Sequence, residues 1–293
     1  MQIDLKQPIL QKNDAIASEL RERFAENHVF VLDLLASPGS GKTSTILATI
    51  DALRDEFNIA VIEGDIASSV DAEKIKAQGI AAVQINTGGA CHLESAMIKR
   101  AVDVLDLERL DLIIVENVGN LVCPTDFDLG ENAKVMILSV PEGDDKPLKY
   151  PGVFQVAEAV VLNKVDTMPV FNFDREAFEA AVTQLNPQAP IFPIAATKGD
   201  GVDAWAEWLA NLESMPPDNP MTTSENPASS MKPLSAFTQR RYRSLFSTTP
   251  SSSIIISQIH QCQREAPRCP RSPRFASCAA RSASPFREAC FRT

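Results

Sequence analysis

The segment from Ala36 to Thr43, Ala-Ser-Pro-Gly-Ser-Gly-Lys-Thr, constrains this chain more than any other feature. It follows an apolar run that predicts a strand, and it precedes residues with helical spacing. Such a turn surrounds phosphate groups with backbone N–H groups and a helix N-terminus. We therefore expect a phosphate-binding loop made by Ser37, Gly39, Ser40, Gly41, Lys42, Thr43 and Ser44.

Two side chains of this loop have expected chemical roles. Lys42 is expected to reach the β and γ phosphates, and the Thr43 hydroxyl to bind Mg²⁺. Ala36 stands where glycine usually begins the motif, a change that removes no ligand. A glycine-rich turn without a ligand would not require Lys-Thr directly after Gly41, so we favour a nucleotide site.

Short apolar runs alternate with segments of helical spacing from residue 28 onward, which predicts an α/β fold with a doubly wound, mostly parallel sheet. Helices are expected over 4–26, 71–78 and 174–185. A further helix should run from the phosphate loop to about residue 57, another should begin at about His92, and the last should include Trp205 and Leu212. The expected strands are 28–35, 59–65, 80–85, 110–116, 133–140, 157–164 and 190–195. We divide the chain into an N-terminal helical segment (1–27), a nucleotide and metal domain (28–214) and a tail (215–293).

The tail differs from the rest of the chain in composition. Residues 230–293 hold 11 of the 28 Lys and Arg but only two of the 38 Asp and Glu, and they are rich in Ser and Pro. This pattern predicts a disordered, basic, low-complexity segment, which could be an extension or a shifted reading frame, or a basic arm that binds an acidic partner.

Composition also restricts the partners and the compartment. The first 229 residues carry 36 of the 38 acidic residues, which argues against nucleic-acid binding by the folded part. No run is long enough to span a membrane, and residues 1–13 lack a signal-peptide pattern. We expect a cytoplasmic protein with no membrane or nucleic-acid partner.

A second motif, Asn163-Lys164-Val165-Asp166, points to the base of the nucleotide. The Asp166 carboxylate can accept from guanine N1–H and from the exocyclic amine, which adenine does not offer, while the Lys164 stem can lie against the base. Ala196 and Thr197 follow the last expected strand, where a second guanine-contacting loop is expected. Together with the phosphate loop, this motif predicts GTP as the nucleotide.

Three carboxylates are candidates for catalysis. Glu116 ends an expected strand and suits a carboxylate near Mg²⁺. Asp65 and Asp71 are candidates for sensing Mg²⁺ or for positioning the attacking water. Asp71 precedes Ala-Glu-Lys, so it could equally be a helix N-cap.

Two thiols and an imidazole form a candidate metal site at Cys91, His92 and Cys123. Cysteine and histidine are preferred ligands of Zn²⁺ and of square-planar Ni²⁺. The residues alone leave open a buried thiol beside a helix N-cap. Because Cys123 follows Glu116 by seven residues, a metal bound there would be linked to the nucleotide-sensing segment.

These motifs resemble the HypB family, the GTPases that assist nickel insertion into [NiFe] hydrogenase. The resemblance runs from about residue 4 to 212. The urease GTPase UreG, a relative, has Cys-Pro-His where this chain has Cys-His. The matching segments are Ser37–Thr43, Glu63–Glu73, Asn86–Gly88, Cys91–Leu93, Glu116–Pro124 and Asn163–Asp166.

The resemblance implies a SIMIBI-class GTPase that forms a homodimer when GTP is bound, with Cys91, His92 and Cys123 binding nickel or zinc at the dimer interface. It also implies a HypA-like nickel chaperone and the hydrogenase large subunit precursor as partners. The N-terminal Cys-rich or His-rich nickel motif of some members is absent from this sequence. Open alternatives are a GTP-gated binding module, a dimer held by structural zinc, and service to another nickel enzyme such as urease.

Overall fold

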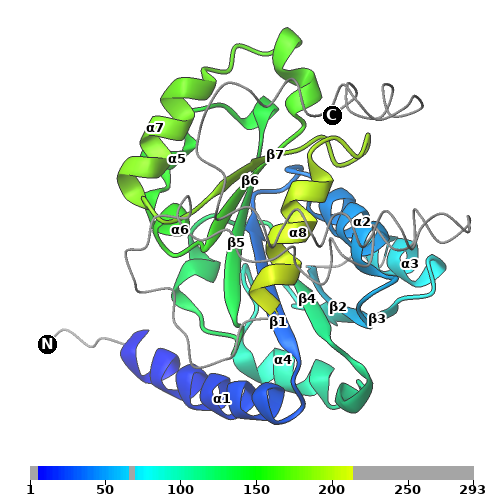
Figure 1. Cartoon of the computed structure of the whole chain (residues 1–293). Helices are drawn as coiled ribbons and strands as arrows, with labels where there is room; N and C mark the ends of the chain where they lie inside the picture. Colours follow the sequence, from blue (N-terminus) through cyan, green and yellow to red (C-terminus); the bar gives the residue numbers. More distant parts are fainter. Residues whose placement is uncertain (1–5, 66–69, 214–293) are drawn as a thin grey trace, which may run out of the picture. The chain divides into compact units, whose positions relative to one another are not determined.

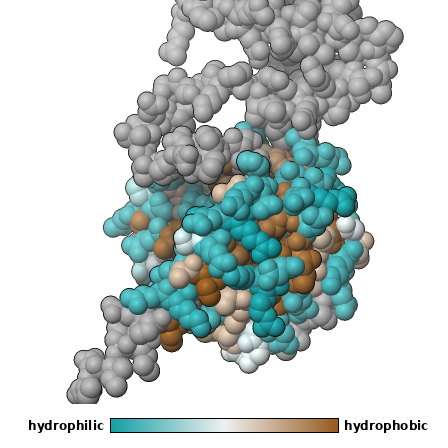
Figure 2. All heavy atoms as spheres, turned by 90° about the horizontal axis from the view of Figure 1, so that it is seen from below, coloured by the Kyte–Doolittle hydropathy of each residue, from teal (hydrophilic) through white to brown (hydrophobic). Residues whose placement is uncertain are grey.

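The computed structural model describes residues 6–65 and 70–213, and all of them lie in the first of two compact units, residues 1–232. The predicted tail, 215–293, lies outside the described residues. No helix among those described is long and apolar enough to cross a bilayer. Seen from below, this unit has a largely hydrophilic surface with hydrophobic residues interspersed (Figure 2).

A seven-stranded sheet in the order β3-β2-β4-β1-β5-β6-β7 forms the centre of the fold (Figure 1). Every neighbouring pair is parallel, which confirms the predicted doubly wound α/β fold. The apolar runs are buried because helices cover both faces. The strands are β1 (Phe30–Ala36), β2 (Ile59–Asp65), β3 (Ala81–Asn86), β4 (Leu112–Glu116), β5 (Ala133–Ser139), β6 (Ala159–Asn163) and β7 (Ile191–Pro193).

Helices connect these strands in the predicted order, with two differences. The predicted helix from about His92 begins three residues later, at Ser95, and short helices that the sequence did not indicate follow β5. The helices are α1 (Lys6–Glu26), α2 (Lys42–Leu53), α3 (Val70–Ala77), α4 (Ser95–Val102), α5 (Lys146–Lys149), α6 (Pro151–Gln155), α7 (Arg175–Leu185) and α8 (Val202–Glu213), with 3-10 turns η1 (Leu107–Arg109), η2 (Cys123–Asp126), η3 (Val140–Glu142) and η4 (Val165–Val170).

Two apolar clusters share one face of the sheet. The first packs α1 and α4 onto β1, β2 and β4, with Leu20 and Phe24 from α1 buried in it. The second packs α6 and α7 onto β5 and β6. Leu93, next to His92, belongs to the first cluster, and Leu121, two residues before Cys123, belongs to the second. The two segments that carry metal-ligand candidates are thus each anchored in the core.

Helices α2 and α8 lie together, with α8 crossing in front of the sheet in Figure 1. The indole Nε1 of Trp205 on α8 donates a hydrogen bond to Thr49 Oγ1 on α2 at 2.8 Å, and both residues are buried. This contact satisfies two buried polar groups. It therefore fixes the helix that starts at the phosphate loop against the last helix of the described chain.

Candidate nucleotide and metal site

The phosphate-loop residues connect β1 to the first turn of α2. Gly41 is the N-cap of α2 and has φ +92°, a left-handed conformation that favours glycine. A Cβ atom at Gly41 would come within 2.4 Å of Asn163 Nδ2. That amide donates a hydrogen bond to the Ser40 carbonyl at 3.0 Å. The loop is therefore shaped by the guanine motif, which is more than 120 residues away in sequence.

The guanine motif follows β6 at the same edge of the sheet. Lys164 has φ +59°, and its ammonium donates to the Gly39 carbonyl at 2.6 Å, so its stem spans the space between the two motifs. Asn163 Oδ1 accepts from the Ala196 N–H at 3.2 Å, which brings the predicted second guanine loop into contact with the first. The remaining predicted contact residues differ in exposure. Thr197 of the second guanine loop is exposed, whereas in the phosphate loop Ser44 is half-buried and Ser40 is fully buried with no hydrogen-bond partner for its hydroxyl among the described residues.

Asp166 is paired with a cation from the second loop. Lys198 Nζ lies 2.9 Å from Asp166 Oδ2, and this carboxylate raises the pKa of Lys198. The Asp166 side chain is 23% exposed, so it is accessible to a ligand. The carboxylate that would accept hydrogen bonds from guanine is therefore held in place by an ion pair with the second predicted guanine loop.

Glu116 lies at the end of β4 beside the start of α2. Thr43 Oγ1 donates to Glu116 Oε1 at 3.1 Å, and Glu116 is only 5% exposed. A hydroxyl and a carboxylate at this spacing are the oxygen ligands that suit Mg²⁺, directly or through water. When bound, Mg²⁺ would supply charge neutralisation for the nucleotide phosphates.

The other two catalytic candidates are less fully described. Asp65 is half-buried at the end of β2, and its carbonyl accepts from the Thr87 N–H at 3.0 Å. Asp71 lies near the start of α3, but its side chain is outside the described part of the chain. Their roles toward Mg²⁺ or water stay predictions.

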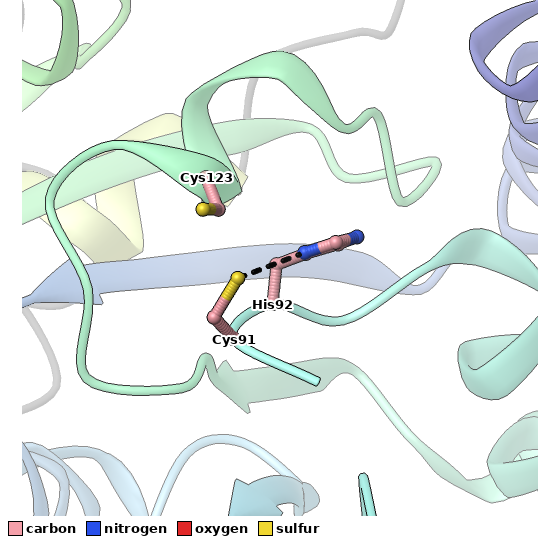
Figure 3. A group of neighbouring side chains, drawn as sticks. All are labelled: Cys91, His92 and Cys123. Carbon is pink, nitrogen blue, oxygen red and sulfur yellow. Dashed lines mark hydrogen bonds between the residues drawn. The ribbon is translucent and has the colours of Figure 1, made fainter. Parts of the chain in front are cut away.

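The three metal-ligand candidates lie together. The Cys91 and Cys123 sulfurs and a His92 ring nitrogen are within 4.8 Å of one another (Figure 3). Cys91 Sγ is 3.7 Å from His92 Nδ1, which points Nδ1 toward the thiols. The neighbouring Cys123 thiol raises the pKa of Cys91. This donor set suits Zn²⁺ or Ni²⁺, and binding would have to displace the thiol proton.

Residues 116–123 run from the nucleotide-site candidates to the metal-ligand candidates. Gly119 packs against the phosphate loop so closely that a Cβ there would lie 2.9 Å from Pro38. Asn120 Nδ2 donates to the Cys91 carbonyl at 3.3 Å, and Asn120 Oδ1 accepts from the Val122 N–H. One short segment therefore contacts Thr43 and Pro38 at one end and the metal-ligand candidates at the other.

A buried charged network extends from β1 to the segment that follows Cys123, and no motif in the sequence indicated it. Asp33 on β1 is fully buried, accepts from Asn117 Nδ2 at 3.1 Å and lies 3.5 Å from Lys134 Nζ. Lys134 also pairs with Glu131 and donates to the Phe127 carbonyl at 3.0 Å. The only signal in the sequence is the placement of two charged residues inside apolar strand runs.

Glu142 is another residue near the site that no motif in the sequence indicated. It caps η3 by accepting from the Ser139 N–H at 2.8 Å and from the Ser139 hydroxyl at 2.7 Å. Its other oxygen accepts from the Ser37 hydroxyl of the phosphate loop. A carboxylate after an expected strand is too common in sequences to have indicated this contact.

We expect Lys134→Met to lower the free energy of unfolding by about 3 kcal/mol at pH 8, because it removes the cation that compensates the buried carboxylates of Asp33 and Glu131. Burial already raises the pKa of Asp33 to about 6, and Lys134 opposes that rise. Without Lys134 the pKa rises further, so Asp33 is protonated in the folded variant at pH 5. The loss should therefore be smaller at pH 5 than at pH 8.

Urea unfolding of both proteins at pH 5, 6.5 and 8 measures this difference. Lys149→Met is a matched control, because Lys149 pairs with Asp145 on the surface and should change stability by less than about 1 kcal/mol. An equal loss at pH 5 and pH 8 would contradict the role given to Asp33.

Comparison with known proteins identifies the family and the fold of this chain. Residues 30–193 match the family model for the CobW/HypB/UreG nucleotide-binding domain. The chain is 47% identical over 207 residues to the hydrogenase maturation factor HypB of Escherichia coli (strain K12), covering 71% of each. It is 43% identical over 211 residues to the hydrogenase/urease maturation factor HypB of Helicobacter pylori (strain J99), covering 71% of this chain and 86% of the relative.

The fold of this chain also matches solved structures of HypB proteins. The crystal structure of HypB from Helicobacter pylori in complex with nickel aligns with a TM-score of 0.66 and 42% identity, covering 69% of this chain and 95% of that one. The family's P-loop fold supports nucleotide hydrolysis. Since the family model spans more than half of the chain and close relatives align over most of their own length, the chain belongs to the HypB family of the CobW/HypB/UreG nucleotide-binding proteins.

Proposed function

We propose that this chain is a GTP-hydrolysing metallochaperone that assists nickel insertion into [NiFe] hydrogenase. Its membership in the HypB family supports hydrogenase maturation, and the relative solved with nickel supports nickel as the cargo. The proposed partners are a second copy of the chain when GTP is bound, a HypA-like nickel chaperone and the hydrogenase large subunit precursor. The relative named for both hydrogenase and urease keeps urease as a minor alternative recipient.

The proposed nucleotide chemistry uses the residues at the carboxyl edge of the sheet. Asp166 recognises guanine, the phosphate-loop amides with Lys42 hold the phosphates, and Thr43 with Glu116 holds Mg²⁺. Asp65 or Asp71 orients the attacking water. The contact between Asn163 and the Ser40 carbonyl supports cooperation between base and phosphate recognition, because guanine binding fixes the loop.

The proposed coupling between GTP and metal depends on residues 116–123. Cys91, His92 and Cys123 supply three ligands, which leaves a tetrahedral or square-planar site incomplete. The GTP state orders the segment that contacts Thr43 and Pro38, and so favours the dimer that completes the site. Hydrolysis then relaxes this segment and releases the metal to the partner.

We expect nickel to bind at least about tenfold more tightly in the presence of Mg²⁺ and a non-hydrolysable GTP analogue than in the presence of Mg²⁺ and GDP, within the usual range of coupling between two sites. Calorimetric titration with Ni²⁺, run with sizing of the protein in each nucleotide state, measures both the coupling and the dimer. Equal nickel affinity in the two states would rule the coupling out.

A further inference from the structure

Asn13, in the middle of α1, is a polar residue that is only 5% exposed. Its Nδ2 donates to the Asp128 carbonyl at 2.7 Å, and its Oδ1 accepts from the Ser95 N–H at 2.8 Å. The Asn13 backbone carbonyl also accepts from the Ser95 hydroxyl at 2.8 Å. One residue of the N-terminal helix therefore holds two segments that lie far apart in sequence.

Both segments come directly after metal-ligand candidates. Ser95 follows His92 by three residues, and Asp128 follows Cys123 by five. Phe127, the neighbour of Asp128, stacks on the His92 ring with a centroid distance of 3.8 Å and an interplanar angle of 25°. Asn13 thus fixes the backbone on one side of His92 and the aromatic ring that lies against it.

A second asparagine holds the same segments from inside the fold. Asn117 is 1% exposed, and its Oδ1 accepts from the Leu93 N–H at 3.2 Å. Its Nδ2 donates to Asp33, which is paired with Lys134. The Cys91–His92 segment is consequently anchored at Leu93 by Asn117 and at Ser95 by Asn13, with its ligand side chains between core and solvent.

A purely structural role for Asn13 would be to cap α4. Glu94, the N-cap of α4, makes no side-chain capping hydrogen bond, so Asn13 supplies an acceptor to the first helical residue from another element. That role does not require the second bond, to Asp128. A buried amide that bonds to both segments fixes their separation, although its partners lie three and five residues beyond the ligand candidates.

We propose that Asn13 is a positioning residue of the metal centre, which sets the distance between the Cys91–His92 pair and Cys123 from the N-terminal helix. The inference rests on the proposed metal-binding function. It gives α1 a role in metal affinity beyond its packing on the apolar core. It also predicts that the affinity depends on the Asp128 half of the contact, not only on the cap of α4.

The test compares nickel affinity of the full-length wild-type chain with that of Asn13→Ala and Asn13→Asp. We expect Asn13→Ala to bind Ni²⁺ roughly 10- to 100-fold more weakly and to show a changed thiolate-to-nickel absorption band. At pH 8, when its carboxyl is ionised, Asn13→Asp keeps the acceptor for Ser95 but has no donor for the Asp128 carbonyl. It should also bind more weakly, by about tenfold.

Asn186→Ala is the matched control. Asn186 donates to the carbonyls of Ala157 at 2.8 Å and Phe154 at 3.2 Å and so loses comparable hydrogen bonds, but it contacts neither metal-bearing segment. Its nickel affinity should equal that of wild type. Wild-type affinity in Asn13→Asp would overturn the inference even if Asn13→Ala does not fold. Absence of nickel binding by the wild-type chain would instead overturn the metal centre itself.

Discussion

Asp166→Asn should weaken the binding of GDP and GTP by about 1,000-fold and shift the preference of the site to xanthosine nucleotides. Guanine presents two donors, N1–H and the amine at C2, and both need acceptors. A carboxylate supplies two acceptors, whereas an asparagine supplies one acceptor and one donor. Xanthine has a carbonyl at C2, so it matches asparagine.

The loss of the ion pair with Lys198 contributes little to this effect. The Lys198 side chain is 58% exposed, and exposed pairs typically contribute less than about 1 kcal/mol. Calorimetric titration with GDP and with xanthosine diphosphate measures both affinities. Asp174→Asn is the control, because Asp174 caps α7 through an oxygen that asparagine retains. Unchanged GDP affinity in Asp166→Asn would remove this residue from the base site.

The placement of the candidate nucleotide motifs at one edge of the sheet could be predicted from the sequence, because each motif follows an apolar run that becomes a strand. Parallel strands place their carboxyl ends at one edge, so Ala36, Glu116 and Asn163 end neighbouring parts of the sheet. The sequence therefore predicted which motifs meet. It did not predict the contacts through which they meet, which are the hydrogen bonds from the Asn163 amide to the Ser40 carbonyl and from the Lys164 ammonium to the Gly39 carbonyl.

The chemistry of Cys91, His92 and Cys123 made them a candidate metal site and left a buried thiol as the alternative, and the family resemblance then favoured one shared site. Cys91 and Cys123 follow different strands, and nothing in their spacing fixes the conformation of either loop. The predicted helix from about His92 begins instead at Ser95, because Leu93 is buried in the core and bonded to Asn117 before the helix starts. This leaves His92 on a loop, where its Nδ1 faces Cys91.

The polar network could not be predicted from periodicity. Asp33 interrupts an apolar strand that would otherwise be a uniform core segment, and its partner Lys134 lies about 100 residues later. Their pairing follows from the register of β1 with β5, in which Asp33 lies opposite Lys134. Asn13 is harder still, since a single asparagine in a charged helix has no local pattern that marks it as buried.

Cys123→Ala should weaken nickel binding by at least about 1,000-fold, a larger loss than the 10- to 100-fold typical of outer-shell partners. The substitution removes one of three ligand atoms that lie within 4.8 Å of one another, and the remaining two cannot enclose a cation. Cys123 begins η2 and its side chain is half-buried, so the fold should tolerate alanine. Nickel and zinc titrations of the metal-free protein measure the loss.

A control variant and a sizing experiment show whether Cys123 binds nickel as cargo or holds a structural zinc ion. Cys262→Ala removes a cysteine of the predicted tail, residues 215–293, and as a control for thiols outside the proposed centre it should keep wild-type nickel affinity. Sizing in the presence of the GTP analogue separates a cargo site from structural zinc. If Cys123→Ala still dimerises with GTP analogue but no longer holds nickel, the thiol serves the cargo. If it abolishes the dimer in the absence of nickel, the three residues hold a structural zinc ion, and the proposed link from Glu116 to Cys123 controls assembly instead of delivery.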